Sequence, residues 1–453
     1  MTNMYFRCGE VECAERVMEG RGESALDRLM MINGYVFNER YAAAVRKIRG
    51  SGDLLQVLMA DSSVVVSVIT ACANLGLIDI GRKVHGVVVM LGDNDNVALG
   101  SALIDMYCKC SSFGEARKVF FDLKERQVSH WNSMIAGCVQ CGLLEEAHCY
   151  FDEMPSKNVI SWTAMISGYV QCGLPQEGLR LLARLYGEEG LAHGNCYTFA
   201  SALNACSSIA ALDAGKQVHG QALKTVAEDG EDYLVLATAL VDMYSKSGNL
   251  SYARRVFDRM GEKNVVSWTS MITGYATHGY GLEAIGVLEQ MMSLGVKPNE
   301  VTFVAILNAC SHSGLVAQGM HYFNLMMKKY GISPRGDHYA CLVDMLGRTG
   351  KLEEAWKVVQ DIKDKSLDGA DGHAILGALL AGCQMHGNVE IGSKVAEEMT
   401  KRRKQTSDAY VALSNVYATA EMWDRVCRVR EEWKKQGVVR EPGLSLIQTG
   451  IVS

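Results

Sequence analysis

The chain has 453 residues and a net charge of −6, with 48% hydrophobic residues, 21% charged residues and only 5 prolines. This acidic balance excludes a protein whose affinity comes mainly from neutralising phosphates, so DNA is not an expected partner. The composition is that of a well-packed, helix-rich chain, and its length allows either two or three domains or one long array.

The sequence lacks the usual marks of membrane insertion, export and disulfide bonding. No apolar run reaches the roughly 18 residues that a membrane-spanning helix needs. The opening MTNMYFRCGEVECAERV has neither the apolar core of a signal peptide nor the Arg/Ser-rich pattern of a transit peptide, so no transit peptide is visible. The 15 cysteines are spread over a long chain, which favours reduced thiols over a disulfide framework.

Three similar segments recur along the chain, each with a tryptophan in the same position. In chain order they are VSHWNSMIAGCVQCGLLEEAHCYFDEMPSKN at 128–158, VISWTAMISGYVQCGLPQEGLRLL from 159, and VVSWTSMITGYATHGYGLEAIGVLEQMMSLGVKPN at 265–299. Their tryptophans are Trp131, Trp162 and Trp268. Internal repetition of this kind is typical of a solenoid.

Each segment predicts two amphipathic helices joined by a glycine turn. In the third segment, apolar residues fall at i, i+3, i+4 and i+7 from Trp268 and again from Ala284. Gly279 lies between the two helices, where a helix end favours left-handed backbone. Other copies have Gly76, Gly142, Gly173, Gly248, Gly314, Gly350 and Gly387 there. Five residues later a small residue lets the two helices lie close together: Gly81, Ala116, Ala147, Gly178, Gly215, Ala253, Ala284, Gly319, Ala355 or Gly392.

The copies differ in length. They begin near residues 25, 62, 97, 128, 159, 196, 234, 265, 300, 336, 373 and 407, and their lengths cluster at 31 and at 35 to 38 residues. A tetratricopeptide scaffold that binds proteins is the alternative, but that family keeps a 34-residue period and a W-x₂-L-G-x₂-Y pattern that is missing here. We therefore expect an all-α fold, an alpha-alpha superhelical solenoid of helix-turn-helix repeats around one continuous core.

No catalytic or metal-binding pattern appears. A nucleobase deaminase needs H-x-E and P-C-x-x-C to hold its zinc and its proton shuttle, and neither occurs, so the chain is expected not to be an enzyme and to need no cofactor. Cys138 and Cys141, with Cys108 and Cys110 one repeat earlier, suggest zinc by spacing, but the repeat gives each a packing position, and we expect structural thiols. The KRRK run at 401–404 is interpreted as a solvated helix end.

The mixture of SWTSMITGY, TFVAILNACSHSGL and ATALVDMYSKSGNLSYARRVFDRM units resembles the long, short and standard motifs of the plant PLS subclass of pentatricopeptide repeat (PPR) proteins. The segments DHYACLVDMLGRTGKLEEAW, LLAGCQMHGNVEIG and YVALSNVYATAEMWDRVCRVREEWKKQGVVREPGLSLI are similar to the last short motif and the E-type C-terminal extension. The resemblance implies a partial PPR motif at 1–24, tandem P, L and S repeats at 25–372, an E-type extension at 373–440 and a tail at 441–453, with no DYW deaminase domain.

The resemblance also implies a function. We expect an RNA-binding protein of mitochondria or chloroplasts, with the mitochondrion preferred, that selects one cytidine for C-to-U RNA editing. Its expected partners are single-stranded organellar RNA, a DYW-type deaminase acting in trans, and multiple organellar RNA editing factor proteins. The alternatives are transcript stabilisation, processing or splicing, and a protein–protein scaffold.

In the family, the fifth and last residues of a motif read one base, and we call each such pair a reading pair. Hydroxyl and amide side chains suit this role because they donate and accept hydrogen bonds. The alternative is a helix N-cap for the Thr and a turn role for the Asn. Long motifs carry apolar residues such as Ala200 and Val304 at the fifth place. The reading pairs are Ser101 with Gln127, Asn132 with Asn158, Thr163 with Asn195, Thr238 with Asn264, and Thr269 with Asn299.

The family's code assigns a base to most reading pairs. Thr with Asn prefers adenine and Asn with Asn prefers cytosine, while Ser101 with Gln127 departs from the usual pairs and leaves an uncertain purine. Because such arrays run N to C along RNA from 5′ to 3′, the expected register is purine, cytosine, adenine, any base, adenine, adenine. The edited cytidine is expected a few nucleotides beyond the last adenine.

Overall fold

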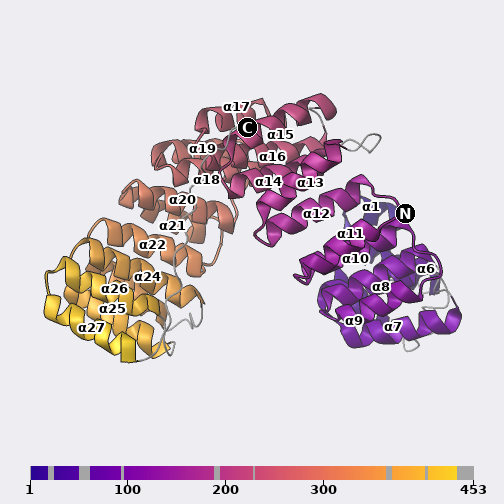
Figure 1. The fold of residues 1–453 in the computed structure, drawn as a ribbon, viewed down its shortest axis with the longest axis horizontal. Helices are drawn as coiled ribbons and strands as arrows, with labels where there is room; N and C mark the ends of the chain where they lie inside the picture. The colour runs from indigo at the N-terminus through magenta and orange to yellow at the C-terminus, as the bar shows by residue number, and fades with distance from the viewer. Residues whose placement is uncertain are drawn as a thin grey trace. The chain divides into compact units, whose positions relative to one another are not determined.

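The computed structural model describes residues 2–18, 25–49, 62–92, 96–187, 194–227, 230–363, 370–402 and 407–435. Every regular element within these ranges is an α-helix, which confirms the predicted all-α solenoid of helical hairpins (Figure 1). The chain divides into two compact units, Met1–Ala239 and Leu240–Ser453, and each is described by itself. No helix among the described residues is long and apolar enough to cross a membrane.

The hairpins of the N-terminal unit follow one another in chain order. Its helices are α1 (Thr2–Arg7), α2 (Val11–Met18), α3 (Ala25–Phe37), α4 (Tyr41–Arg49), α6 (Ser62–Leu75), α7 (Ile78–Leu91), α8 (Val97–Lys109), α9 (Phe113–Asp122), α10 (Val128–Gln140), α11 (Leu144–Glu153), α12 (Val159–Gln171), α13 (Pro175–Gly187), α14 (Cys196–Ser208) and α15 (Leu212–Thr225). The unit boundary falls within α16 (Glu231–Lys246).

The C-terminal unit continues the pattern of hairpins. Its helices are α17 (Leu250–Arg259), α18 (Val265–Thr277), α19 (Gly281–Ser293), α20 (Glu300–His312), α21 (Val316–Lys328), α22 (Gly336–Arg348), α23 (Leu352–Lys363), α24 (Ala370–Met385), α25 (Val389–Arg402), α26 (Ser407–Thr419) and α27 (Trp423–Lys435). The first helix of a repeat packs against its own second helix and against the next first helix, as α18 does against α19 and α20.

The predicted starts of the repeats agree closely with the helix starts. Helices begin at residues 25, 62, 97, 128, 159, 196, 265, 300, 336 and 407. The predicted starts at 234 and 373 are each three residues late, because α16 begins at Glu231 and α24 at Ala370. The extra turn of α16 carries Asp232, an acidic residue that the dipole of a helix N-terminus favours.

Turns between paired helices use left-handed backbone. Gly142 has φ 74° and Gly279 has φ 77°, as predicted for residues at this place. The repeats that begin at 97 and 196 use Ser111 at φ 58° and Ala210 at φ 51° instead. The same turn therefore forms even where a side chain has to accept the strain.

Small residues set the distance between helices. Ala147 and Ala284 are fully buried, and a Cβ added to Gly81 would lie 2.5 Å from Met106 Sδ of the next first helix. In α24 a Cβ on Gly382 would lie 2.7 Å from the Gly347 Cα of α22, a distance that side-chain movement cannot relieve. These contacts lie between successive repeats, and the prediction that a larger side chain would separate the two helices of one hairpin stays a prediction.

The repeated tryptophans join consecutive repeats. Each packs edge to face on a phenylalanine of the preceding second helix, with ring centroids 4.9 Å apart for Trp131 and Phe120 and for Trp268 and Phe257. Trp162 and Phe151 are 4.8 Å apart in the same geometry. Aromatic pairs of this kind add to the burial energy of the core and fix the angle between hairpins.

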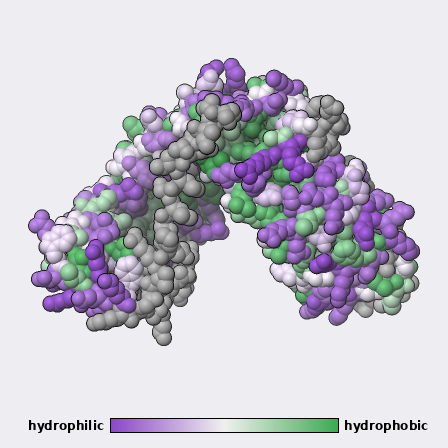
Figure 2. All heavy atoms as spheres, viewed as in Figure 1, coloured by the Kyte–Doolittle hydropathy of each residue, from purple (hydrophilic) through white to green (hydrophobic). Residues whose placement is uncertain are grey.

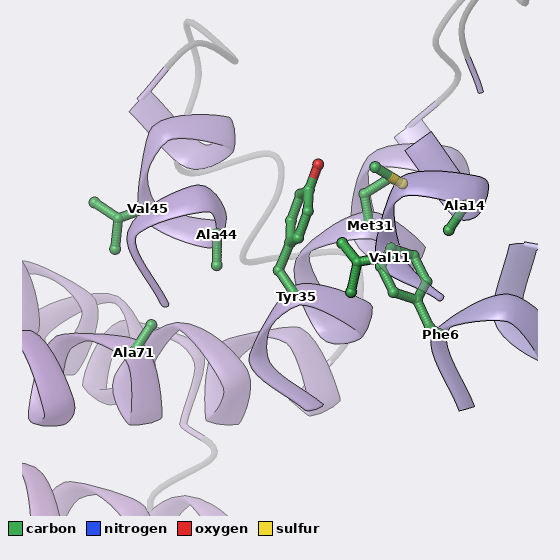
Figure 3. Close-up of a cluster of buried hydrophobic side chains, with 8 residues drawn as sticks. All are labelled: Phe6, Val11, Ala14, Met31, Tyr35, Ala44, Val45 and Ala71. Atoms are coloured by element: carbon green, nitrogen blue, oxygen red, sulfur yellow. The ribbon is translucent and has the colours of Figure 1, made fainter. Parts of the chain in front are cut away.

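The N-terminal hairpins form a hydrophobic cluster with the repeat that follows. Phe6 of α1 meets Tyr35 of α3 at 5.8 Å, and Ala71 of α6 closes the cluster (Figure 3). The Tyr35 hydroxyl donates to Glu15 Oε1 at 2.7 Å.

On the visible face in Figure 2, hydrophilic residues cover most of helices α7 to α11, with smaller apolar patches between them. Large apolar side chains such as Phe120, Met134 and Phe151 are buried in this unit.

Two buried histidines hold consecutive first helices together. His130 Nδ1 accepts from the Gln127 backbone N–H at 3.1 Å, so its Nε2 carries the proton and donates to the Val97 carbonyl at 3.1 Å. His338 repeats the arrangement with Arg335 and Glu300. Burial lowers the pKa of both imidazoles from the ordinary 6.5, against the smaller opposing effect of the carbonyl.

We expect the chain to lose stability as the pH falls from 7.5 to 5.5. A histidine whose pKa is lowered in the folded state binds a proton more readily when unfolded, so its stabilising effect is full above the unfolded pKa of about 6.5 and is lost below it. Thermal melts across this range should show the decline. The double variant H130S/H338S, with the serine that other repeats use at this position, should show a smaller decline; an unchanged decline would contradict the assignment.

Candidate nucleic-acid interface

Where a repeat ends in asparagine, that residue caps the first helix of the next repeat. Asn158 Oδ1 accepts from the Ser161 backbone N–H at 3.0 Å. Asn264 does the same with Ser267, and Asn299 with Thr302, both at 3.0 Å. The side chain of the Asn is thereby fixed at the start of α12, α18 or α20, with its oxygen used for the cap.

The amide nitrogens of these asparagines remain available. Asn195, Asn264 and Asn299 are exposed, and no hydrogen bond to a described residue uses their Nδ2. The N-cap therefore leaves each Asn as an oriented hydrogen-bond donor. The alternative interpretation assigned the N-cap to the Thr, and in this respect it was wrong, because the Asn has that role.

Two reading pairs are joined through a third side chain. Thr198 Oγ1 donates to Asn195 Oδ1 at 2.9 Å, and Thr163 Oγ1 lies 2.7 Å from Thr198 Oγ1. Since the single proton of the Thr198 hydroxyl goes to Asn195, Thr163 donates to Thr198. The same relay joins Thr269 to Thr302 at 2.8 Å and Thr302 to Asn299 at 2.9 Å. In each case the two threonines lie more than 30 positions apart in the sequence, and hydrogen bonds connect them to the asparagine in one polar cluster.

The other reading pairs differ. Asn132 Nδ2 donates directly to Asn158 Oδ1 over 3.4 Å, which brings that pair together. The Thr238 hydroxyl donates instead to the Leu234 carbonyl of its own helix at 2.7 Å. Ser101 Oγ is buried without a hydrogen-bond partner among the described residues, and its predicted partner Gln127 is exposed. No hydrogen bond within the described chain joins Ser101 to Gln127 or Thr238 to Asn264.

Large apolar side chains lie exposed beside the capping asparagines. The second residue of the first helix is 62% exposed in Ile160 and Val301 and 59% exposed in Val266. Such side chains, two residues after an N-cap, form small apolar contact surfaces beside the asparagines. Sequence reasoning missed them, because within an apolar motif only their position at the exposed helix start distinguishes them from core residues.

The lysine immediately before a capping asparagine contacts the C-terminal end of the preceding second helix. Lys263 donates to the Met260 carbonyl at 2.7 Å and lies 5.2 Å from the centre of the Phe257 ring. Lys157 has the same position over Phe151 at 5.2 Å. The backbone at Asn158 and Asn264 is thus fixed by two contacts. The preceding lysine packs over a phenylalanine ring, and the asparagine itself caps the following helix.

The four cysteines suggested by spacing differ in burial, since Cys110 and Cys141 are half-buried residues at the ends of α8 and α10. Cys108 and Cys138 are buried, and burial raises the pKa of Cys108 to about 12. Cys141 Sγ lies 3.6 Å from the Cys108 carbonyl. Among the described residues, no group of three or more potential ligands could hold a metal ion.

Of the KRRK run, residues 403 and 404 lie outside the described residues, and α25 ends at Arg402.

The fold and this surface define an α-helical repeat protein that presents polar groups at the starts of several of its first helices. Models of known families agree: the PPR repeat matches residues 101–128, 129–159, 160–187, 235–265, 301–330 and 337–367, the PPR repeat family matches 263–312, and the E motif matches 386–448. The chain belongs to the pentatricopeptide repeat family. The boundaries predicted at 24, 372 and 440 stay predictions, and 441–453 lies outside the described residues.

Curated relatives from Arabidopsis thaliana support the assignment. The chain is 36% identical to pentatricopeptide repeat-containing protein At1g50270 over 449 residues, 98% of this chain and 68% of that protein. It is 33% identical to the chloroplastic pentatricopeptide repeat-containing protein At3g57430 over 462 residues, 99% of this chain and 47% of that protein. The chain spans about half the length of the first curated relatives it matches.

A solved structure supports the fold. The crystal structure of pentatricopeptide repeat protein PPR10 from maize aligns with a TM-score of 0.52 over 97% of this chain and 73% of that chain. The identity of 16% limits this likeness to the arrangement of helices.

Proposed function

We propose that the chain binds single-stranded RNA and reads one base with each reading pair. The observation that supports this most is the relay of Thr163, Thr198 and Asn195, repeated in Thr269, Thr302 and Asn299. Each relay uses the oxygen of an asparagine and leaves its Nδ2 exposed, which is a donor suited to the ring nitrogen on the Watson–Crick edge of adenine. The exposed Val266 and Val301 supply apolar contact to the base faces.

The proposal includes a register and a direction. From 5′ to 3′ the chain meets a purine, cytosine, adenine, any base, adenine and adenine. Ser101 with Gln127 contributes least, because the Ser101 hydroxyl is buried. The net charge of −6 agrees with a binding energy drawn from bases more than from phosphates.

We further propose that the chain is a non-enzymatic specificity factor for organellar C-to-U editing. The similarity of residues 386–448 to the E motif supports this role. In this proposal the C-terminal extension recruits a deaminase in trans, and multiple organellar RNA editing factor proteins take part. The names of relatives place some in chloroplasts and some in mitochondria, and the mitochondrion remains our preference.

Loss of the protein should abolish C-to-U conversion at one organellar cytidine that lies a few nucleotides 3′ of the proposed register. Sequencing of organellar transcripts from a knockout measures this. The purified chain alone should convert no cytidine in that RNA, since it has no H-x-E and P-C-x-x-C zinc set. A knockout with normal editing but reduced transcript abundance would contradict the editing role and favour stabilisation.

A further inference from the structure

The third residue of a first helix differs between repeats in the hydrogen bonds that it makes. In α14 and α20 it is Thr198 and Thr302, both fully buried. Thr198 Oγ1 accepts from the Asn195 backbone N–H at 3.3 Å and from the Thr163 hydroxyl, and it donates to Asn195 Oδ1. A hydroxyl has one donor and two acceptor sites, so every site of Thr198 is used. Thr302 makes the same three bonds in its own repeat.

A serine in this position gives its proton to a different acceptor. It donates to the backbone carbonyl of the preceding asparagine, at 2.7 Å for Ser161 and at 2.9 Å for Ser267. The hydroxyl of the serine therefore does not donate to the asparagine side chain. Thr238 is the fifth residue of the repeat before Ser267, and its hydroxyl donates to the Leu234 carbonyl of its own helix.

A histidine in this position has no hydrogen bond left for the fifth residue. His130 Nδ1 accepts from the Gln127 N–H and its Nε2 donates to the Val97 carbonyl, so both ring nitrogens are used. Ser101 is the fifth residue of the preceding repeat, and its buried Oγ has no hydrogen-bond partner among the described residues. Only a threonine as third residue thus joins the hydroxyl of a fifth residue to a capping asparagine.

The threonine relay fixes the direction of each proton. The Thr198 backbone N–H donates to Asn195 Oδ1 at 2.9 Å, so this oxygen is an acceptor and the exposed Nδ2 is the donor that Asn195 offers. The Thr198 hydroxyl donates to the same oxygen, and Thr163 donates to Thr198. Thr163 has then used its only proton and offers a base only its lone pairs.

This proton order matches adenine and opposes guanine. It presents an acceptor, Thr163 Oγ1, together with a donor, Asn195 Nδ2. Adenine has the complementary amino group and ring nitrogen, whereas guanine has a keto oxygen and a ring N–H. Thr163 can donate to a keto oxygen only by withdrawing its proton from Thr198, which leaves a buried hydroxyl with one partner fewer.

Resting on the proposed RNA binding, we propose that the third residue of the following repeat is a positioning residue that sets how strictly a reading pair excludes guanine. Thr198 and Thr302 make their pairs strict. Thr238, which precedes a serine, can turn its proton from the Leu234 carbonyl to a keto oxygen at little cost, because a helix carbonyl already accepts from a backbone N–H. Its pair with Asn264 therefore tolerates guanine better.

The test measures the affinity of the full chain for the register RNA and for three RNAs that carry guanine in place of one adenine, at the third, fifth or sixth nucleotide. In the wild type, guanine at the third or sixth nucleotide should weaken binding about tenfold more than guanine at the fifth, the scale of one hydrogen bond lost by a buried group. This comparison needs no substitution. Equal losses at the three nucleotides would contradict the positioning role and leave base reading intact.

The double variant T198V/T302V removes both relay hydroxyls and keeps the β-branched shape. It should reduce the loss caused by guanine at the third and sixth nucleotides about tenfold, to that at the fifth. The matched control is S161A, which removes the hydroxyl from the same position of α12. Asn132 Nδ2 reaches Asn158 Oδ1 directly at 3.4 Å, so S161A should leave all these ratios within about twofold of the wild type.

The converse variant Q127N/H130T supplies a capping asparagine and a relay threonine for the partnerless Ser101 hydroxyl. It should raise the preference for adenine over guanine at the first nucleotide about tenfold. Circular dichroism melts check that the variants fold. Unchanged ratios in folded T198V/T302V or Q127N/H130T, or an equal effect of S161A, would overturn the positioning role while RNA binding stands. If the wild type binds none of these RNAs, both proposals fail.

Discussion

Replacing Asn264 and Asn299 by Asp should move the preference of their repeats from adenine towards guanine. Asp caps a helix as well as Asn does, so the Oδ1 bonds to Ser267 and Thr302 are kept. The substitution changes only the exposed Nδ2, which becomes an acceptor that suits the ring N–H of guanine. A change of this kind is worth about 1–3 kcal/mol per base, by analogy with bidentate readout in DNA.

Fluorescence anisotropy with two RNAs measures the change, one with adenines and one with guanines at the last two positions of the register. The wild type should prefer the first RNA and N264D/N299D the second. The matched control is N249D, because Asn249 Oδ1 caps the second helix α17 by accepting from Tyr252 N–H at 3.3 Å. A shift in N249D equal to that of the double variant, or no shift in either, would contradict base reading by these residues.

Trp268→Ala should destabilise the C-terminal unit by about 3–5 kcal/mol, the usual cost of deleting a large buried aromatic side chain. Trp268 is 1% exposed and packs edge to face on Phe257. Because repeats contact mainly their neighbours, the loss should concentrate in α17, α18 and α19. Hydrogen exchange should therefore accelerate there more than in α22.

Trp423→Ala is the control for this substitution. Trp423 of α27 is 63% exposed, so its removal should change the free energy of unfolding by no more than about 0.5 kcal/mol. Denaturant unfolding of both variants gives the comparison. Equal destabilisation by the two substitutions would show that Trp268 does not join consecutive repeats in the way described.

The sequence predicted the hairpins well because each signal is local. A glycine such as Gly142 or Gly279 marks a turn by its own backbone freedom, and the tryptophan position marks the start of a helix within a few residues. The left-handed backbone of Ser111 and Ala210 was not predicted, because neither serine nor alanine favours this conformation.

The candidate site was predicted only in part. The register of fifth and last residues selected Thr163 and Asn195, but the Thr198 hydroxyl that joins them belongs to the next repeat. That contact depends on the distance between α12 and α14, which the spacing of apolar residues in the sequence does not predict. The same limit applies to the Thr238 hydroxyl, which donates to the Leu234 carbonyl of its own helix. The sequence pattern does not predict whether a threonine makes this bond or presents its hydroxyl to a ligand.

The most direct test is the affinity of the wild-type chain for two RNAs. One carries purine, cytosine, adenine, any base, adenine, adenine; the other has its three adenines changed to guanine. At about 1–3 kcal/mol per base, the second RNA should bind roughly a hundredfold more weakly or worse in electrophoretic mobility shifts at matched salt. Equal affinity for the two RNAs would contradict base reading by Thr163, Asn195, Thr238, Asn264, Thr269 and Asn299.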